Sequence, residues 1–150
     1  MNIEKIAIID PSTGRPVSLE EWKKVEDPKI AEWILVETDE LRPFLVGKDL
    51  LDGGKVMTWH EAVASGAAPT RAQALALYDA RFAGLDEAIA LLAGTTPWEI
   101  TWTRDEDKDP DYATHAWLVL MHYGYVDYIA KTRGYRVRPV SAFNPSDFEL

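Results

Sequence analysis

Residues 98–143 read WEITWTRDEDKDPDYATHAWLVLMHYGYVDYIAKTRGYRVRPVSAF, and this stretch decides the fold. It holds three of the six tryptophans and five of the six tyrosines, in short apolar segments separated by turn residues. Trp98, Ile100 and Trp102 alternate with polar residues, which is typical of a half-buried strand. Several such segments in succession indicate an antiparallel sheet rather than a helical unit.

Three more strands are predicted within this stretch, at residues 115–121, 125–129 and 136–138, with a turn at Tyr123-Gly124 and with Pro139 suited to an edge. In the first of them, successive side chains point to opposite faces. One face carries His115, Trp117, Val119 and Met121, and the other carries Ala116, Leu118 and Leu120. The two leucines need a cover, either from another part of the chain or from a partner. A protein-binding surface is our hypothesis for them.

The N-terminal half is predicted to mix strands with short helices. Strands are expected at residues 3–9 and 15–17, and a helix at 18–24, which Ser18 and Glu21 begin as a capping box. The continuous apolar run at residues 30–38 favours a strand buried on both faces, paired with residues 44–46 in a hairpin. Residues 1–29 form an N-terminal extension of a single domain, residues 1–143, and residues 144–150 form a C-terminal tail.

Three helices are predicted between the two groups of strands. Capping boxes begin the first at Thr58 and the second at Thr70, and Asp86 begins the third. Glycines are expected to end them, at Gly66, Gly84 and Gly94. The buried stripe of the second helix is predicted to contain Leu75, Tyr78 and Phe82, with Ala74 and Leu77 alongside.

Composition excludes several classes of function. The 150-residue chain has no cysteine, so disulfides and thiolate metal sites are excluded. Its net charge of −9 disfavours a nucleic-acid partner, because phosphate binding needs clustered cations. The first apolar run is too short for a signal sequence, and no later run could cross a bilayer. We therefore expect no membrane insertion, and a cytoplasmic or virion-assembled protein.

No catalytic motif is visible, and we expect neither a cofactor nor a metal ion. His60-Glu61 resembles the start of a zinc-protease motif, but Ala64 stands where the second histidine belongs. The alternating aspartates of residues 105–111 suggest calcium, yet Pro110 and Ala116 break the EF-hand pattern. A solvated acidic loop is the favoured interpretation.

Aromatic residues are the best binding candidates. Tyr123, Tyr125 and Tyr128 combine a large contact area with few rotatable bonds. Burial as cross-strand pairs stays open for Tyr123 and Tyr125. His122 adjoins the turn and could touch a ligand. The large tryptophans are expected in the core, namely Trp33, Trp59, Trp98, Trp102 and Trp117.

Five short motifs resemble a bacterial and phage family of C-type-lectin-fold domains. They are Met57-Thr-Trp-His-Glu-Ala62, Ala68-Pro-Thr-Arg71, Trp102-Thr103, Ala116-Trp117 and Tyr135-Arg-Val-Arg-Pro-Val-Ser-Ala-Phe143. The family includes the targets of diversity-generating retroelements, phage tail-tip receptor-binding proteins and many gut-bacterial proteins. The resemblance implies an α+β fold of C-type-lectin type, a twisted antiparallel sheet with flanking helices.

The resemblance also implies which residues contact a ligand. Carried onto this chain, these are Asp111, Tyr112, Ala113, Thr114, Leu118, Leu120, Tyr123, Tyr125, Asp127, Tyr128, Ile129, Thr132 and Arg133. We therefore expect a non-enzymatic domain that binds a protein or a cell-surface glycan through a face built from residues 104–114 and 118–133. The alternative is a structural or assembly protein of a phage or mobile element that oligomerises through the same face. A hydrolase whose site the sequence does not reveal is a third hypothesis.

Overall fold

The computed structural model describes residues 1–25, 30–94, 100–106 and 114–143, and they form a mixed α+β fold with antiparallel sheets. The predicted α+β class is therefore confirmed. The strands are β1 (Ile3–Ile9), β2 (Pro16–Val17), β3 (Trp33–Thr38), β4 (Phe44–Gly47), β5 (Ile100–Glu106), β6 (His115–Leu120), β7 (Tyr125–Ala130) and β8 (Val140–Ala142). The helices are α1 (Leu19–Lys23), α2 (Trp59–Ala64), α3 (Arg71–Ala80) and α4 (Asp86–Ala93), with a 3-10 turn η1 (Leu51–Gly53) and a π-helical turn η2 (Arg81–Leu85).

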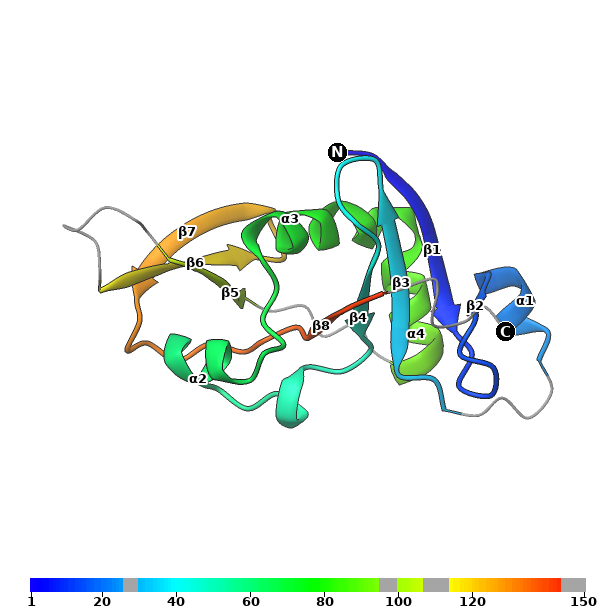
Figure 1. The fold of residues 1–150 in the computed structure, drawn as a ribbon, viewed down its shortest axis with the longest axis horizontal. Helices are drawn as coiled ribbons and strands as arrows, with labels where there is room; N and C mark the ends of the chain where they lie inside the picture. Colours follow the sequence, from blue (N-terminus) through cyan, green and yellow to red (C-terminus); the bar gives the residue numbers. More distant parts are fainter. Residues whose placement is uncertain (26–29, 95–99, 107–113, 144–150) are drawn as a thin grey trace.

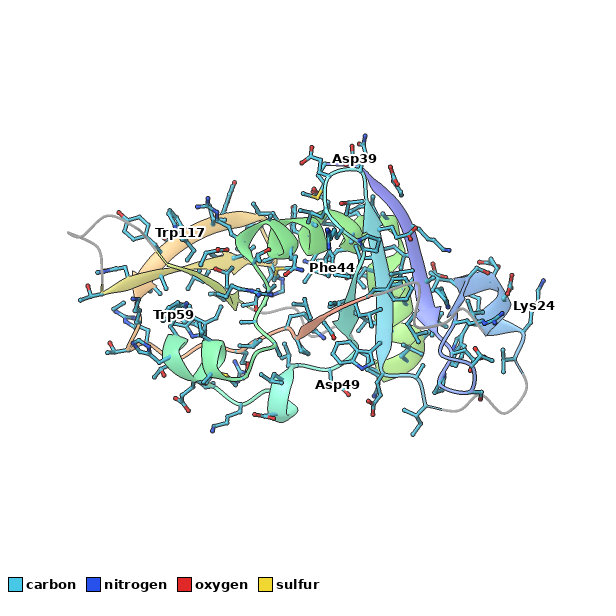
Figure 2. All side chains as sticks on the ribbon, in the orientation of Figure 1. Lys24, Asp39, Phe44, Asp49, Trp59 and Trp117 are labelled. Atoms are coloured by element: carbon cyan, nitrogen blue, oxygen red, sulfur yellow. The ribbon has the colours of Figure 1, made fainter. Side chains whose placement is uncertain are left out.

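The strands form two separate sheets. One has five strands in the order β2-β1-β3-β4-β8, and the other has three in the order β5-β6-β7. The three-stranded sheet lies at one end of an elongated molecule, between α2 and α3 (Figure 1). Figure 2 shows Trp59 on the α2 side of this sheet and Trp117 on the opposite side. The aromatic stretch is therefore divided between two sheets, since its last strand, β8, belongs to the larger one.

Residues 135–140 cross from the smaller sheet to the larger one (Figure 1). The predicted strand at residues 136–138 is wrong. Tyr135 and Arg136 make only isolated bridges, to Met57 and Thr101, and regular pairing resumes at β8, which pairs with β4. A crossing segment exchanges one set of partners for another, so it cannot keep a regular ladder.

Helix-capping signals in the sequence are confirmed. The hydroxyls of Ser18, Thr58 and Thr70 each accept the backbone N–H three residues later, and the boxes at Thr58 and Thr70 are reciprocal. The box predicted for Ser18 and Glu21 is only half formed, because the Glu21 side chain does not accept the backbone N–H of Ser18. Gly66 and Gly94 follow their helices with positive φ, as C-terminal glycines do. Gly84 does not end the second helix as predicted. It lies within η2, through which the chain passes from α3 to α4.

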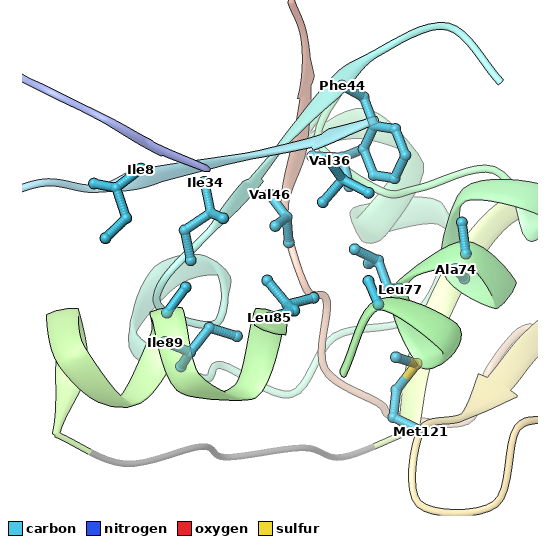
Figure 3. Packing of buried hydrophobic residues seen from close by; sticks show 14 of the residues in the cluster. Ile8, Ile34, Val36, Phe44, Val46, Ala74, Leu77, Leu85, Ile89 and Met121 are labelled. Carbon is cyan, nitrogen blue, oxygen red and sulfur yellow. The ribbon is translucent and has the colours of Figure 1, made fainter. Parts of the chain in front are cut away.

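The larger core lies between the five-stranded sheet and the helices. Figure 3 shows Ile34, Val36 and Val46 of the sheet pointing toward Leu77 of α3 and Ile89 of α4. Leu35, on the other face of β3, is also buried, which confirms the prediction of a strand buried on both faces. A run of consecutive apolar side chains can be buried in full only on a central strand that is covered on both faces.

The buried stripe of α3 differs from the predicted one. Ala74, Leu77 and Ala80 are fully buried, whereas Tyr78 is half-buried and Phe82 is 70% exposed. Phe82 lies in η2, where the helical period changes, so a stripe extrapolated at 3.6 residues per turn misplaces it. Phe82 is therefore a surface residue, not a core residue.

A second core lies between α2 and the three-stranded sheet, and it covers Leu118. This side chain is 2% exposed and packs with Trp59, Ala62 and Trp102, while Leu120 is half-buried against the same cluster. For Leu118 the hypothesis of a protein-binding surface is wrong, because the chain itself covers this side chain, whereas Leu120 is only partly covered. Trp59 and Trp102 confirm the predicted tryptophan core, Trp33 and Trp117 are half-buried, and Trp98 lies outside the described residues.

The turn between β6 and β7 packs closely against Tyr78 of α3. Gly124 has φ 74°, and a Cβ built on it would lie 2.5 Å from a ring carbon of Tyr78. We expect Gly124→Ala to lower the free energy of unfolding by about 2–4 kcal/mol, from left-handed strain plus overpacking. Gly66→Ala is the matched control, since Gly66 has φ 72° but open space around it, and should cost about 1 kcal/mol. Equal losses in urea unfolding would show that Tyr78 moves aside freely.

Burial of Leu118 predicts a large loss on truncation. Leu118→Ala should lower the free energy of unfolding by about 2–5 kcal/mol, because a cavity opens beneath Trp102. Leu91→Ala, at an exposed position of α4, should change it by less than about 0.5 kcal/mol. Chemical denaturation of both variants measures the difference. A Leu118→Ala variant as stable as Leu91→Ala would contradict the burial of Leu118.

Candidate functional site

Tyr123 and Tyr125 form the most exposed aromatic pair of the described residues at the β6–β7 turn. They are 66% and 68% exposed, and their rings stack with centroids 6.2 Å apart and planes inclined by 16°. The turn is closed by the amide of Gly124, which donates to the carbonyl of Leu120 at 2.9 Å. Burial as cross-strand pairs, the alternative that the sequence left open for these two tyrosines, is therefore not what the fold adopts. The stacked rings offer a flat surface that is already in position.

Strand register places Tyr128 on the other side of the sheet from Tyr125. Leu118 pairs with Asp127 and Leu120 with Tyr125, so these side chains share the face toward α2. Trp117 pairs with Tyr128, on the face toward α3. The predicted single face is therefore divided in two. We call Tyr123, Tyr125 and Asp127 the tyrosine surface, and treat the Tyr128 side separately.

The Tyr128 side is an edge-to-face aromatic cluster at the start of α3. The ring of Tyr128 lies 5.1 Å from that of Trp117 and 5.8 Å from that of His115. The guanidinium of Arg71 lies over Trp117, 4.8 Å from its ring centre. The carboxylate of Asp105 accepts the backbone N–H of Arg71 and so ties β5 to the first turn of α3. These contacts hold Trp117 rigidly, although it is only half-buried.

Strand β7 is the outer strand of its sheet, with β6 as its strand partner in the described part of the chain. Four consecutive residues, 125–128, are exposed, so both faces of the strand reach solvent near the turn. The backbone N–H of Tyr128 donates to Oδ1 of Asp127 at 2.8 Å. An exposed strand edge can pair with another chain, and an acidic side chain at that edge counteracts such pairing.

The other predicted site residues lie around this hairpin to different extents. His122 and Thr114 are exposed, as are Thr132 and Arg133 beyond β7, and Ile129 is half-buried against the second core. The Thr114 hydroxyl hydrogen-bonds His115 Nδ1 at 2.9 Å. Asp111, Tyr112 and Ala113 lie outside the described residues. The hairpin thus brings together part of the predicted set and leaves Leu118 in the core.

Sequence reasoning missed two residues beside the turn, Tyr78 and Phe82. Their rings meet edge to face at 5.3 Å, and Tyr78 packs against Gly124. Both were assigned to the helix core because they are apolar and spaced four apart. Only the η2 turn, which periodicity does not reveal, brings Phe82 to the surface next to the hairpin.

Within the described ranges, no three His, Asp or Glu side chains cluster as metal ligands. Residues 107–111 of the acidic loop 105–111 fall outside those ranges, so the expectation of a solvated loop without calcium stays a prediction. No helix in the described part of the chain is long and apolar enough to cross a bilayer.

No protein-family model matches the chain, and no curated protein matches it. The resemblance to lectin-fold domains therefore rests on the short motifs alone, and the function has to be inferred from the hairpin, its exposed rings and its strand edge.

Proposed function

We propose that the chain is a non-enzymatic binding domain that recognises a protein or a cell-surface glycan through the tyrosine surface. The observation that carries the proposal is the stacked pair Tyr123 and Tyr125, two large rings left in solvent on a strand hairpin. Tyrosine is favoured in binding loops because it supplies wide contact area and a hydroxyl at a small cost in rotamer entropy. A flat aromatic surface suits both the apolar face of a sugar and a protein side chain.

Preorganisation supports this proposal. The turn is fixed by Gly124 against Tyr78, and the strand behind it is anchored in both cores through β6. A surface that is already ordered loses little conformational entropy when it binds, so more of the contact energy appears as affinity. Asp127 next to the rings adds an acceptor for hydroxyl or cationic groups of a ligand.

The proposal extends to a C-type-lectin-like fold. Two features support it beyond the α+β class. The strand β8, near the C-terminus, returns to the sheet that begins with β1. The intervening strands β5 to β7 form their own sheet, flanked by α2 and α3, and carry the exposed tyrosines. A five-stranded scaffold that β8 rejoins beside β4, with a separate sheet for contact, fits a receptor-binding or retroelement-target domain.

Assembly through the same hairpin is the second candidate, and the open edge of β7 is the observation that favours it. Two copies could pair their β7 strands into one continuous sheet. Against this, self-pairing would bring two Asp127 carboxylates together in a chain of net charge −9. Light scattering distinguishes the two, since assembly requires a dimer at micromolar concentration and the binding domain requires none.

A double variant tests the tyrosine surface. Tyr123→Ser with Tyr125→Ser should change the free energy of unfolding by less than about 0.5 kcal/mol, because both rings are exposed. Affinity for ligands found on a glycan array or a panel of bacterial surface proteins should fall at least about tenfold, as for aromatic hot spots. Biolayer interferometry on the two immobilised proteins gives the comparison.

Ile30→Ser provides the matched control. Ile30 is 76% exposed and lies in the segment leading into β3, far along the chain from the hairpin. This variant should bind every ligand of the unmodified chain with unchanged affinity. Ligands that bind the double tyrosine variant as well as they bind the control would contradict the tyrosine surface as the site.

A further inference from the structure

A separate cavity of about 410 Å³ lies at the end of β3 and β4, away from the hairpin. It is formed by the starts and ends of segments far apart in the sequence: residues 32–33, 47–53, Ala67 and Pro139. Figure 2 shows Asp49, on its rim, beside the five-stranded sheet, whereas Trp117 lies at the far end of the molecule. Its volume is within the range of small-molecule sites.

The floor of the cavity is rigidly built. Gly47 lets Pro139 approach so closely that a Cβ on Gly47 would lie 2.7 Å from Pro139 Cγ. Behind this floor Arg138, 1% exposed, donates from Nη1 to the carbonyls of Gly47 at 3.2 Å and Lys48 at 3.0 Å. The amide of Lys48 also donates to the carbonyl of Glu32 at 2.9 Å, which joins two walls. The hollow therefore exists before any ligand enters.

The walls are apolar and include one aromatic ring. Trp33 lines the cavity with Leu50, Leu51 and Pro139. In the described residues the indole N–H groups of Trp59 and Trp102 each donate to a backbone carbonyl, whereas that of Trp33 makes no hydrogen bond. A half-buried indole with its N–H uncommitted can pack against a ligand and can also donate to it.

The charged residues around the cavity favour one sign of ligand charge. Its lining carries the carboxylates of Glu32, Asp49 and Asp52. Two cations lie close to Asp49: Lys48, which pairs with it at 2.9 Å, and the buried Arg138 behind the floor. Glu32 and Asp52 make no ion pair within the described residues, so a cation would be attracted to these two carboxylates and to the face of an indole.

We propose that this cavity binds a small organic cation with apolar substituents, such as a quaternary or alkylated ammonium. The apolar groups contact Leu50, Leu51 and Pro139, and the cationic centre lies against Trp33 beneath Glu32 and Asp52. This site does not depend on the tyrosine surface, so either can be correct without the other.

Three probes of one shape test the proposal with the full chain. Choline carries the cation, 3,3-dimethylbutan-1-ol replaces nitrogen by carbon, and 3,3-dimethylbutanoate is an anion of similar shape. Tryptophan indole N–H signals followed by ¹⁵N–¹H NMR report binding, and the signal that disappears in Trp33→Leu identifies Trp33. We expect choline to move this signal saturably with a Kd in the millimolar range, about fivefold or more tighter than the neutral alcohol. The anion should not bind.

Rim and wall variants complete the test. Glu32→Gln with Asp52→Asn, both exposed positions, should weaken choline at least about threefold and reduce its salt dependence, since two rim charges are gone. Trp33→Leu should abolish the preference for choline over the alcohol. Tyr125→Ser should leave choline binding unchanged. If Trp33→Leu does not fold, Trp33→Phe identifies the signal instead, and the rim variant and the three probes still decide the question.

Two results would overturn the proposal. The first is a Trp33 signal that does not saturate with choline up to about 50 mM, a concentration well above the millimolar Kd that we expect. The second is equal affinity for choline and its neutral isostere, which would make the cavity a general apolar hollow. Unchanged affinity for choline in the rim variant would also overturn the proposal, because the rim carboxylates would then play no part in binding.

Discussion

The strand β6 is buried on both faces, and the rest of the structure depends on this constraint. Val119 packs into the core below the five-stranded sheet, together with Met121 just beyond the strand, while Ala116 and Leu118 pack into the core beneath α2. One six-residue strand therefore contributes side chains to both hydrophobic cores. Because protein interiors are close-packed and resist deformation, a strand held on both sides is a fixed support. The exposed strand β7 pairs with it over six residues and inherits that rigidity.

A second link between the two halves is the crossing segment with Arg138. Its backbone N–H donates to the hydroxyl of Thr101 on β5, and its guanidinium donates to carbonyls at the end of β4. Burial lowers the pKa of Arg138 to about 10, opposed by the nearby carboxylates of Asp49 and Asp86, so the group remains charged at neutral pH. A buried cation is tolerated only where fixed acceptors replace water. The acceptors used here are the same carbonyls that form the cavity floor.

Local signals in the sequence predicted local structure well. Thr58 and Thr70 begin their helices as expected, and the alternation from His115 to Met121 places every side chain on the correct face of β6. What periodicity cannot supply is the identity of the covering element. Leu118 was correctly opposed to Trp117, yet only the tertiary fold shows that α2 lies over it. The sequence indicated which residues of the hairpin could make contacts, but the division of the predicted face between two sides of the sheet follows from the register with β6. The cavity at Trp33 joins four distant segments that no single motif marks.

The same packing sets which hairpin positions can vary without loss of the fold. Tyr123, Tyr125, Asp127, Thr132 and Arg133 are exposed, so their side chains contribute contact surface and little core energy. Leu118 contributes core energy and no contact surface, because α2 and Trp102 enclose it. A substitution at Leu118 would therefore lower the amount of folded protein without altering the exposed surface. A binding surface on this scaffold therefore has to be drawn from β7 and its flanking turns, with β6 held constant as the strand on which both cores depend.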